Sequence, residues 1–241
     1  MGNIFIIAFS LAVMVAGAYV TKKNSKLPNS TTIVQPSETL LSIQAISNQF
    51  LNRAAQSGLI LSFVPEIREW TRPSLISWRQ EARAVAVPNW SELSETQHAL
   101  LLRMAGTGND ELLFNYLFRW FFVPHELSHA LETNLGGKHD NAASEQLAND
   151  IAVAFYMEQE VEQKLMELER ILENALPNLP PLPDTPDYFN KHYQEMGQNN
   201  LPLYAAYQTT FVLNSIHKRK NLSLDLLFKE LVNSKETKIR N

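Results

Sequence analysis

The segment His125-Glu126-Leu127-Ser128-His129 constrains the fold of this chain more than any other feature of the sequence. On an α-helix, residues four apart lie one turn apart on the same face, so the two imidazoles would point the same way. Two such imidazoles can bind one zinc ion, and the glutamate after the first histidine can reach a water on that ion and take its proton. The motif therefore requires a helix here and a third ligand from elsewhere in the chain.

Hydrophobic patterning predicts a mainly α-helical α+β domain over residues 37–241, with the motif in its core. The aromatic-rich segment 111–123 is apolar on most sides and predicts a central core helix before the motif. Two short apolar runs, at 75–78 and 84–87, flank a charged turn and predict a small β-hairpin. Further helices are expected at 37–56, 94–104, 141–175, 187–196, 203–218 and 223–232.

The first 20 residues predict a signal peptide or a membrane anchor. Residues 4–20 are almost entirely apolar, and Ala16-Gly17-Ala18 resembles the small-residue site at which signal peptidase cuts. Lysines follow at positions 22, 23 and 26, a charge pattern that can instead hold an uncleaved anchor in the membrane. The protein is expected to be exported (periplasmic or extracellular) or anchored at its N-terminus, with the side of the membrane left open. Polar residues 21–36 are expected to form a linker.

The net charge and the lack of cysteine limit the expected binding partners of the protein and the residue types that could bind a metal. The formal net charge is −4 and the largest basic cluster is the short run 217–220, so nucleic acid is not an expected partner. The chain has no cysteine, which excludes disulfides, a thiolate nucleophile and cysteine-bound zinc. Histidine, glutamate and aspartate remain as strong ligands, and one Zn²⁺ per chain is the expected cofactor.

The third ligand is expected from the helix that follows the motif. Gly136-Gly137 predicts the end of the motif helix, and the next helix can begin near residue 141, so the two form an antiparallel hairpin. His129 then lies about 9 Å above the turn and Glu145 about 6 Å above it, nearly level with each other. The other nearby candidates lie in the turn or are expected to face away: His139, Asp140 and Glu132. Glu145 is therefore the predicted third ligand.

The residues just after Glu145 are candidates to orient a ligand imidazole. Asn149 lies one turn beyond Glu145 on the same face, level with His125 in the predicted hairpin. A polar group behind a ligand imidazole fixes the orientation of its ring. Asn149, or the adjacent Asp150, is predicted to have this role.

The motif, followed by Glu145-Gln146-Leu147-Ala148-Asn149-Asp150, resembles the gluzincin branch of the zincin metallopeptidases over roughly residues 110–156. In that branch a downstream helix carries the third zinc ligand in a Glu-x-x-x-Asp arrangement. Here the fourth residue after the glutamate is Asn149, and the aspartate comes one position later. The resemblance implies a zincin-like helical core.

The resemblance also implies a zinc-dependent metallopeptidase that acts on a peptide or protein substrate. Glu126 would be the general base, and His125, His129 and Glu145 would hold the zinc ion. Such sites usually add a Tyr or His side chain that stabilises the oxyanion of the reaction. Four downstream residues are candidates for this role: His192, Tyr193, Tyr204 and Tyr207.

Two other functions remain open from the sequence. Glu95 and His98 repeat the spacing of Glu126 and His129, and two such pairs on facing helices can bind two iron ions. The capping-box pattern that begins at Ser94 already accounts for residues 94–97. The other possibility is a non-catalytic, membrane-anchored helical protein that binds a partner through the acidic segment 158–174.

Overall fold

The computed structural model describes residues 38–71, 75–106, 108–137, 139–183, 185 and 187–233. The predicted signal or anchor segment and the linker lie outside these residues. No helix in the described part of the chain is long and apolar enough to cross a membrane. The fold is α+β and mainly helical, with one small sheet, as the sequence predicts.

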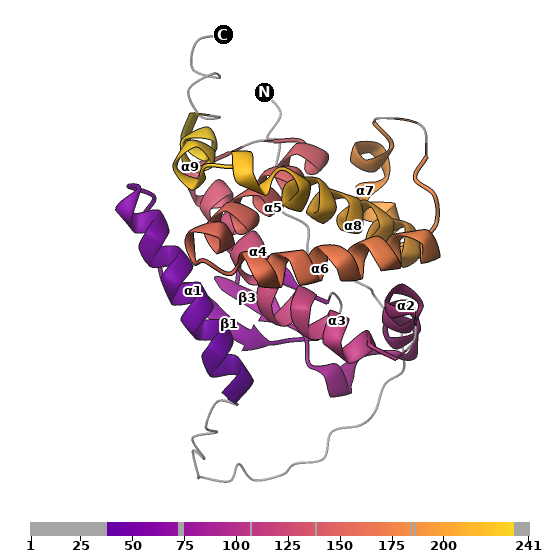
Figure 1. Ribbon diagram of the computed structural model, residues 1–241. Coiled ribbons are helices and arrows are strands. Elements are labelled where there is room, and N and C mark those ends of the chain that lie inside the picture. The colour runs from indigo at the N-terminus through magenta and orange to yellow at the C-terminus, as the bar shows by residue number, and fades with distance from the viewer. Residues whose placement is uncertain are drawn as a thin grey trace, which may run out of the picture.

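The predicted hairpin and most predicted helices are confirmed, with boundaries shifted by a few residues (Figure 1). The elements are α1 (Glu38–Gln56), β1 (Glu66–Glu69), β2 (Ser77–Arg79), β3 (Ala84–Val87), α2 (Glu95–Ala105), α3 (Asp110–Tyr116), α4 (Phe122–Leu135), α5 (Asn141–Glu158), α6 (Glu162–Ala175), α7 (Tyr188–Asn199), α8 (Leu201–His217) and α9 (Leu224–Asn233). The motif lies in α4 and Glu145 lies in α5.

The sheet has the order β1-β3-β2. β2 and β3 pair antiparallel, and β1, which the sequence did not predict, pairs parallel with β3. β1 was missed because its residues 66–69 are charged apart from Ile67 and largely exposed, as befits an edge strand. The central strand β3 is buried along its whole length, and β2 forms the other edge, next to α4.

Helix α5 is the centre of the helical part. It packs against α4 on one side and against α7, α8 and α9 on others, while α1 covers α4 and β1. α6 and α8 run side by side across the middle of the view in Figure 1. This arrangement buries most of α5, including the polar residues Glu145, Asn149 and Asp150. Buried polar groups on a central helix need specific partners, because water cannot reach them.

The chain is helical from Asp110 into α4 through a π-helical turn at residues 117–121. Pro124 explains this turn, since it has no N–H to donate to the carbonyl of Trp120, four residues earlier, and its ring would clash with that carbonyl. The hydroxyl of Tyr156, on α5, donates to the Trp120 carbonyl at 2.7 Å instead. The proline therefore sets the start of the motif helix, and α5 satisfies the carbonyl that the proline leaves free.

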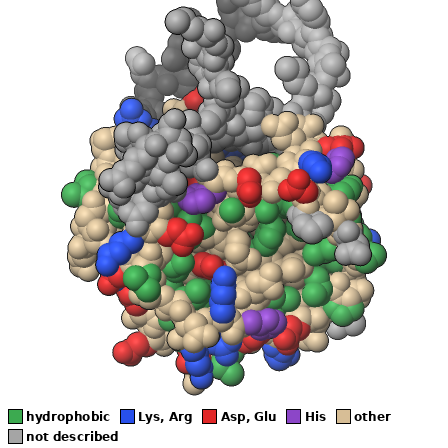
Figure 2. Space-filling view, turned by 90° about the horizontal axis from the view of Figure 1, so that it is seen from above, with side chains coloured by type: hydrophobic (Ala, Val, Ile, Leu, Met, Phe, Trp, Pro, Cys, Tyr) green, Lys and Arg blue, Asp and Glu red, His purple; other side chains and the backbone are tan. Residues whose placement is uncertain are grey.

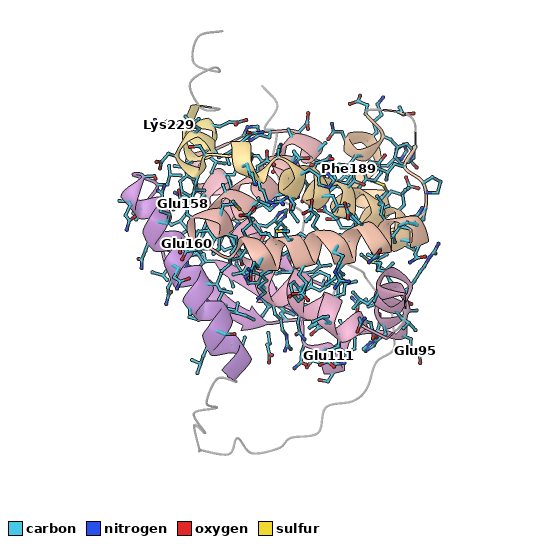
Figure 3. The ribbon with its side chains drawn as sticks, viewed as in Figure 1. Glu95, Glu111, Glu158, Glu160, Phe189 and Lys229 are labelled. Carbon is cyan, nitrogen blue, oxygen red and sulfur yellow. The ribbon has the colours of Figure 1, made fainter. Side chains whose placement is uncertain are left out.

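The single helix predicted over residues 141–175 is wrong, because the chain turns between α5 and α6. Glu160 adopts φ 57°, and the N–H of Val161 reaches back to the Tyr156 carbonyl at 3.3 Å. This is the C-terminal turn that glycine usually makes, so a glutamate in the left-handed position hides it from sequence analysis. Glu158, at the end of α5, bonds Arg53 of α1 at 2.6 Å (Figure 3).

Charged side chains of both signs lie on the face of the molecule shown in Figure 2. On the face shown in Figure 2, acidic and basic side chains are interspersed, and the described residues form no broad basic patch there. Several basic side chains are paired with acidic ones, as with Arg53 on Glu158 and Arg219 on Glu162.

Candidate metal centre

A tight turn between α4 and α5 brings the motif and Glu145 together. Gly136 takes the left-handed conformation, with φ 72°, and the N–H of Gly137 donates to the Glu132 carbonyl at 2.8 Å. The left-handed conformation and this hydrogen bond are both features of the helix C-terminus that the two glycines predict. Asp140 then caps α5 by accepting from the N–H of Ala143 at 2.9 Å. The two helices form the antiparallel hairpin that the sequence predicts.

The three predicted ligands converge on one point in this hairpin. The Nε2 atoms of His125 and His129 lie 3.2 Å apart. Glu145 Oε2 lies 3.2 Å from His125 Nε2 and 3.9 Å from His129 Nε2. All three donor atoms lie within 4.8 Å of one another. Two imidazole nitrogens and one carboxylate oxygen, with no sulfur, are a ligand set that catalytic zinc sites use.

Asn149 holds the imidazole of His125 from behind. Its Oδ1 lies 3.0 Å from His125 Nδ1, and its Nδ2 donates to the Glu145 carbonyl at 2.9 Å. Because Nδ1 is engaged, Nε2 of this ring is the nitrogen free to bind a metal. The alternative candidate, Asp150, points to α8 instead, where Ser215 donates to it at 2.5 Å and Lys218 lies 2.7 Å away.

Glu132, which was expected to face away from the metal, is not one of the three converging donors. Its carboxylate lies behind His129, with Oε2 3.7 Å from His129 Nδ1. Ser144 donates to the same Oε2 at 2.7 Å, and His139 lies 2.6 Å from Oε1. The side chain can take this path because Gly137 has no Cβ, which would meet Glu132 Cγ at 2.6 Å. Both motif histidines therefore have a polar group behind Nδ1.

Glu126 contacts the sheet. Its Oε2 accepts a hydrogen bond from the backbone N–H of Trp78, on the edge strand β2, at 2.6 Å. This bond fixes the carboxylate beside the two histidines and ties the predicted hairpin to the motif. Burial raises the pKa of Glu126, with a smaller lowering effect from His125 and His129. A carboxylate whose pKa is raised towards neutral pH is a stronger base.

The electrostatic field of the site favours positive charge. Burial lowers the pKa of His129, but hydrogen bonds to Glu132 and Glu145 outweigh it and raise this pKa well above its ordinary value. For Glu145 the reverse holds: burial raises the pKa, and the hydrogen bonds of His125 and His129 lower it well below its ordinary range. A proton is thus stabilised among these side chains, and a cation would be stabilised for the same reason.

Of the four candidate oxyanion stabilisers, the structure brings Tyr193 and Tyr204 to the site. Tyr193 donates to Glu145 Oε1 at 3.2 Å, and its ring lies 5.9 Å from that of Tyr204. His192 is instead paired with Glu195 at 3.1 Å on the exposed side of α7. Tyr207, on α8, packs with Phe189 of α7 in an aromatic cluster. Tyr193 is the hydroxyl closest to the candidate ligands by these contacts.

The di-iron alternative does not fit this geometry. Within the described residues, two groups of His, Asp and Glu could hold a metal, and neither contains Glu95 or His98. Glu95 is exposed at the edge of the molecule, on α2 (Figure 3). The ring of His98 packs against Trp90 at 4.5 Å. The predicted capping box between Ser94 and Gln97 is present, so the start of α2 is accounted for by helix capping.

Removing the amide behind His125 is expected to weaken zinc binding. Asn149→Ala should raise the zinc dissociation constant by about 10- to 100-fold, since such orienting groups have effects of that size. Asn149→Asp should stay close to wild type, because a carboxylate can accept from the same ring nitrogen. Competition with a chromophoric chelator measures both values. Equal dissociation constants for wild type and Asn149→Ala would show that Asn149 does not orient the ligand.

The carboxylate of Glu132 is expected to make the metal-free protein less stable in acid. Burial raises its pKa, but hydrogen bonds from His129, Ser144 and His139 outweigh burial and hold it at about 2, below the ordinary 4.5. Ionised Glu132 therefore stabilises the fold above pH 4.5, and this stabilisation is lost as the pH falls towards 2. The loss between pH 5 and pH 3 is about 2 kcal/mol.

Urea unfolding of metal-free wild type and Glu132→Gln over this pH range measures the effect. The difference in free energy of unfolding between the two proteins should shrink as the pH falls. A difference that stays constant from pH 5 to pH 3 would contradict the assigned hydrogen bonds.

Comparisons of the chain with protein-family models, with curated proteins and with solved structures find no match. The site comprises three converging donors, a buried glutamate beside them and a polar group behind each imidazole.

Proposed function

We propose that the protein is a zinc-dependent metallopeptidase whose metal is held by His125, His129 and Glu145. The observation that carries this proposal is the convergence of these three donors within 4.8 Å, on two helices joined by a tight turn. Glu126 lies beside them, buried and fixed by the N–H of Trp78. The donor types, their number and the adjacent carboxylate together match the requirements of a hydrolytic zinc site.

Zinc bound here would supply a Lewis acid that lowers the pKa of a water and polarises the substrate carbonyl. Glu126 would accept the proton of that water and later deliver it to the leaving amine. Asn149 and Glu132 would keep the two imidazoles oriented through their Nδ1 atoms. Tyr193, whose hydroxyl donates to Glu145 Oε1 at 3.2 Å, would give up that bond and donate the same hydrogen to the developing oxyanion.

The position of β2 supports a peptide as the substrate. β2 is an edge strand, and its Trp78 N–H already points away from β3 to Glu126. Because this N–H is bonded to Glu126, an extended peptide would add along the edge by taking the N–H over from that carboxylate. The scissile carbonyl of a peptide aligned in this way would lie near the metal ligands.

Metal removal and readdition test the proposal. The full chain is expected to cleave unfolded casein or a library of short peptides, to lose this activity when a chelator removes its metal, and to regain it with one equivalent of Zn²⁺ at the candidate metal centre. Because the metal would supply the electrophile and the activated water, the metal-free rate should approach background. Zinc-loaded protein that cleaves neither casein nor any library peptide would contradict the proposed function and favour a binding role.

A further inference from the structure

A second group of side chains has the donor types and spacing of a metal site. Glu169 and Glu173 lie four residues apart on α6, and His217 lies at the C-terminal end of α8. Their donor atoms all lie within 4.8 Å of one another. We propose that this group, the α6–α8 group, binds a second divalent transition-metal ion that links the two helices.

The distances in the α6–α8 group resemble those of the candidate metal centre. His217 Nε2 lies 3.3 Å from Glu169 Oε1 and 3.5 Å from Glu173 Oε1. A single ring nitrogen carries at most one hydrogen, so a neutral imidazole cannot direct a good hydrogen bond at both carboxylates. A cation between the three atoms accepts a lone pair from each of them, and the i, i+4 spacing keeps both glutamates on one face of α6.

Arg219 fixes the orientation of Glu169 in this group. Its Nη1 lies 3.1 Å from Glu169 Oε2, and its Nε lies 3.2 Å from Glu162 Oε1. The guanidinium thus holds one oxygen of Glu169 and leaves Oε1 directed at His217. Among these five side chains, three carboxylates surround one guanidinium, so two negative charges remain when His217 is neutral. A divalent ion neutralises that charge.

The donor types of the α6–α8 group indicate which metal it binds, and the exposure of its side chains indicates how readily that metal exchanges with solvent. One imidazole and two carboxylates favour zinc, cobalt or nickel over calcium and magnesium, which prefer oxygen ligands alone. The side chains of His217 and Glu173 are 53% and 55% exposed, whereas that of Glu169 is 18% exposed. The ion therefore exchanges with solvent more readily than one in the buried centre. It would fasten α8, which carries Tyr204 beside Tyr193, to α6.

Zinc titration in a background that lacks the first centre tests this proposal. In the full chain with His129→Ala, one zinc ion per chain should still bind. Adding His217→Ala should raise its dissociation constant by at least about tenfold, and adding Glu173→Gln should also weaken binding, because each change removes one of three ligands. The matched control adds His192→Ala, which removes an exposed histidine that is paired with Glu195 on α7, and it should leave binding unchanged.

Equal zinc affinity for His129→Ala and His129→Ala/His217→Ala would overturn the second site, as would an equal loss in the His192→Ala control. The proposal does not depend on the proposed function, because the titration is made where the first centre is already disabled. The same variants in the otherwise wild-type chain give a second measurement: two zinc ions are expected for wild type and one for His217→Ala.

Discussion

Replacing Glu126 by glutamine is expected to lower the rate of peptide hydrolysis by about 10²- to 10⁴-fold, the usual contribution of a general base. Glutamine has the same shape and can still accept the hydrogen bond from the Trp78 N–H, so the fold and the metal ligands should be undisturbed. What it cannot do is take a proton from water. Bound zinc should therefore remain at the wild-type level while hydrolysis is lost. Steady-state rates and zinc content, measured on the same preparation, give both quantities.

A matched control for this variant is Glu195→Gln, which changes an exposed carboxylate on α7 that is paired with His192. It should leave both hydrolysis and zinc content unchanged. Hydrolysis by Glu126→Gln at the wild-type rate would remove Glu126 from the mechanism and leave the base unassigned.

Replacing Glu145 by alanine is expected to raise the dissociation constant for zinc at the first centre by more than about 100-fold. Changes to groups that only orient a ligand already cost 10- to 100-fold, and this change removes a ligand itself. His125 and His129 would remain as two donors, with a cavity in place of the carboxylate. Hydrolysis should fall with the metal content. Zinc titration of the His217→Ala protein, with and without Glu145→Ala, isolates the first centre.

Asp150→Asn is the control on the same helix. Asp150 is as buried as Glu145 but bonds Ser215 and Lys218 on the α8 side, so its loss should lower stability and leave zinc binding intact. Unchanged zinc affinity in Glu145→Ala would refute Glu145 as the third ligand, whatever the behaviour of the control.

The parts of the site set by local chemistry could be predicted from the sequence. The Gly136-Gly137 pair ends α4 in a left-handed turn, and Asp140 caps α5, so the hairpin and the level of Glu145 follow from residues close together in the chain. The position of Asn149 follows from Glu145 by one helical turn.

Contacts made across the fold could not be predicted. Glu132 reaches His129 only because its side chain passes over Gly137, a path that the angular spacing on a helix does not show. The hydrogen bond from the Trp78 N–H to Glu126 joins segments 48 residues apart and depends on how the sheet packs on α4. The break after α5 was hidden because Glu160, rather than glycine, adopts the left-handed conformation. In the first two cases tertiary contacts extend a local pattern, and in the third an unusual backbone conformation of one residue ends it.

Anomalous scattering at the zinc edge, from crystals of the zinc-loaded full chain, tests the central claim most directly. The predicted result is a zinc peak bound by the Nε2 atoms of His125 and His129 and by a carboxylate oxygen of Glu145, with Glu126 close by but not a ligand. A map with no zinc peak among these three side chains, or with Glu145 turned away from one, would contradict it.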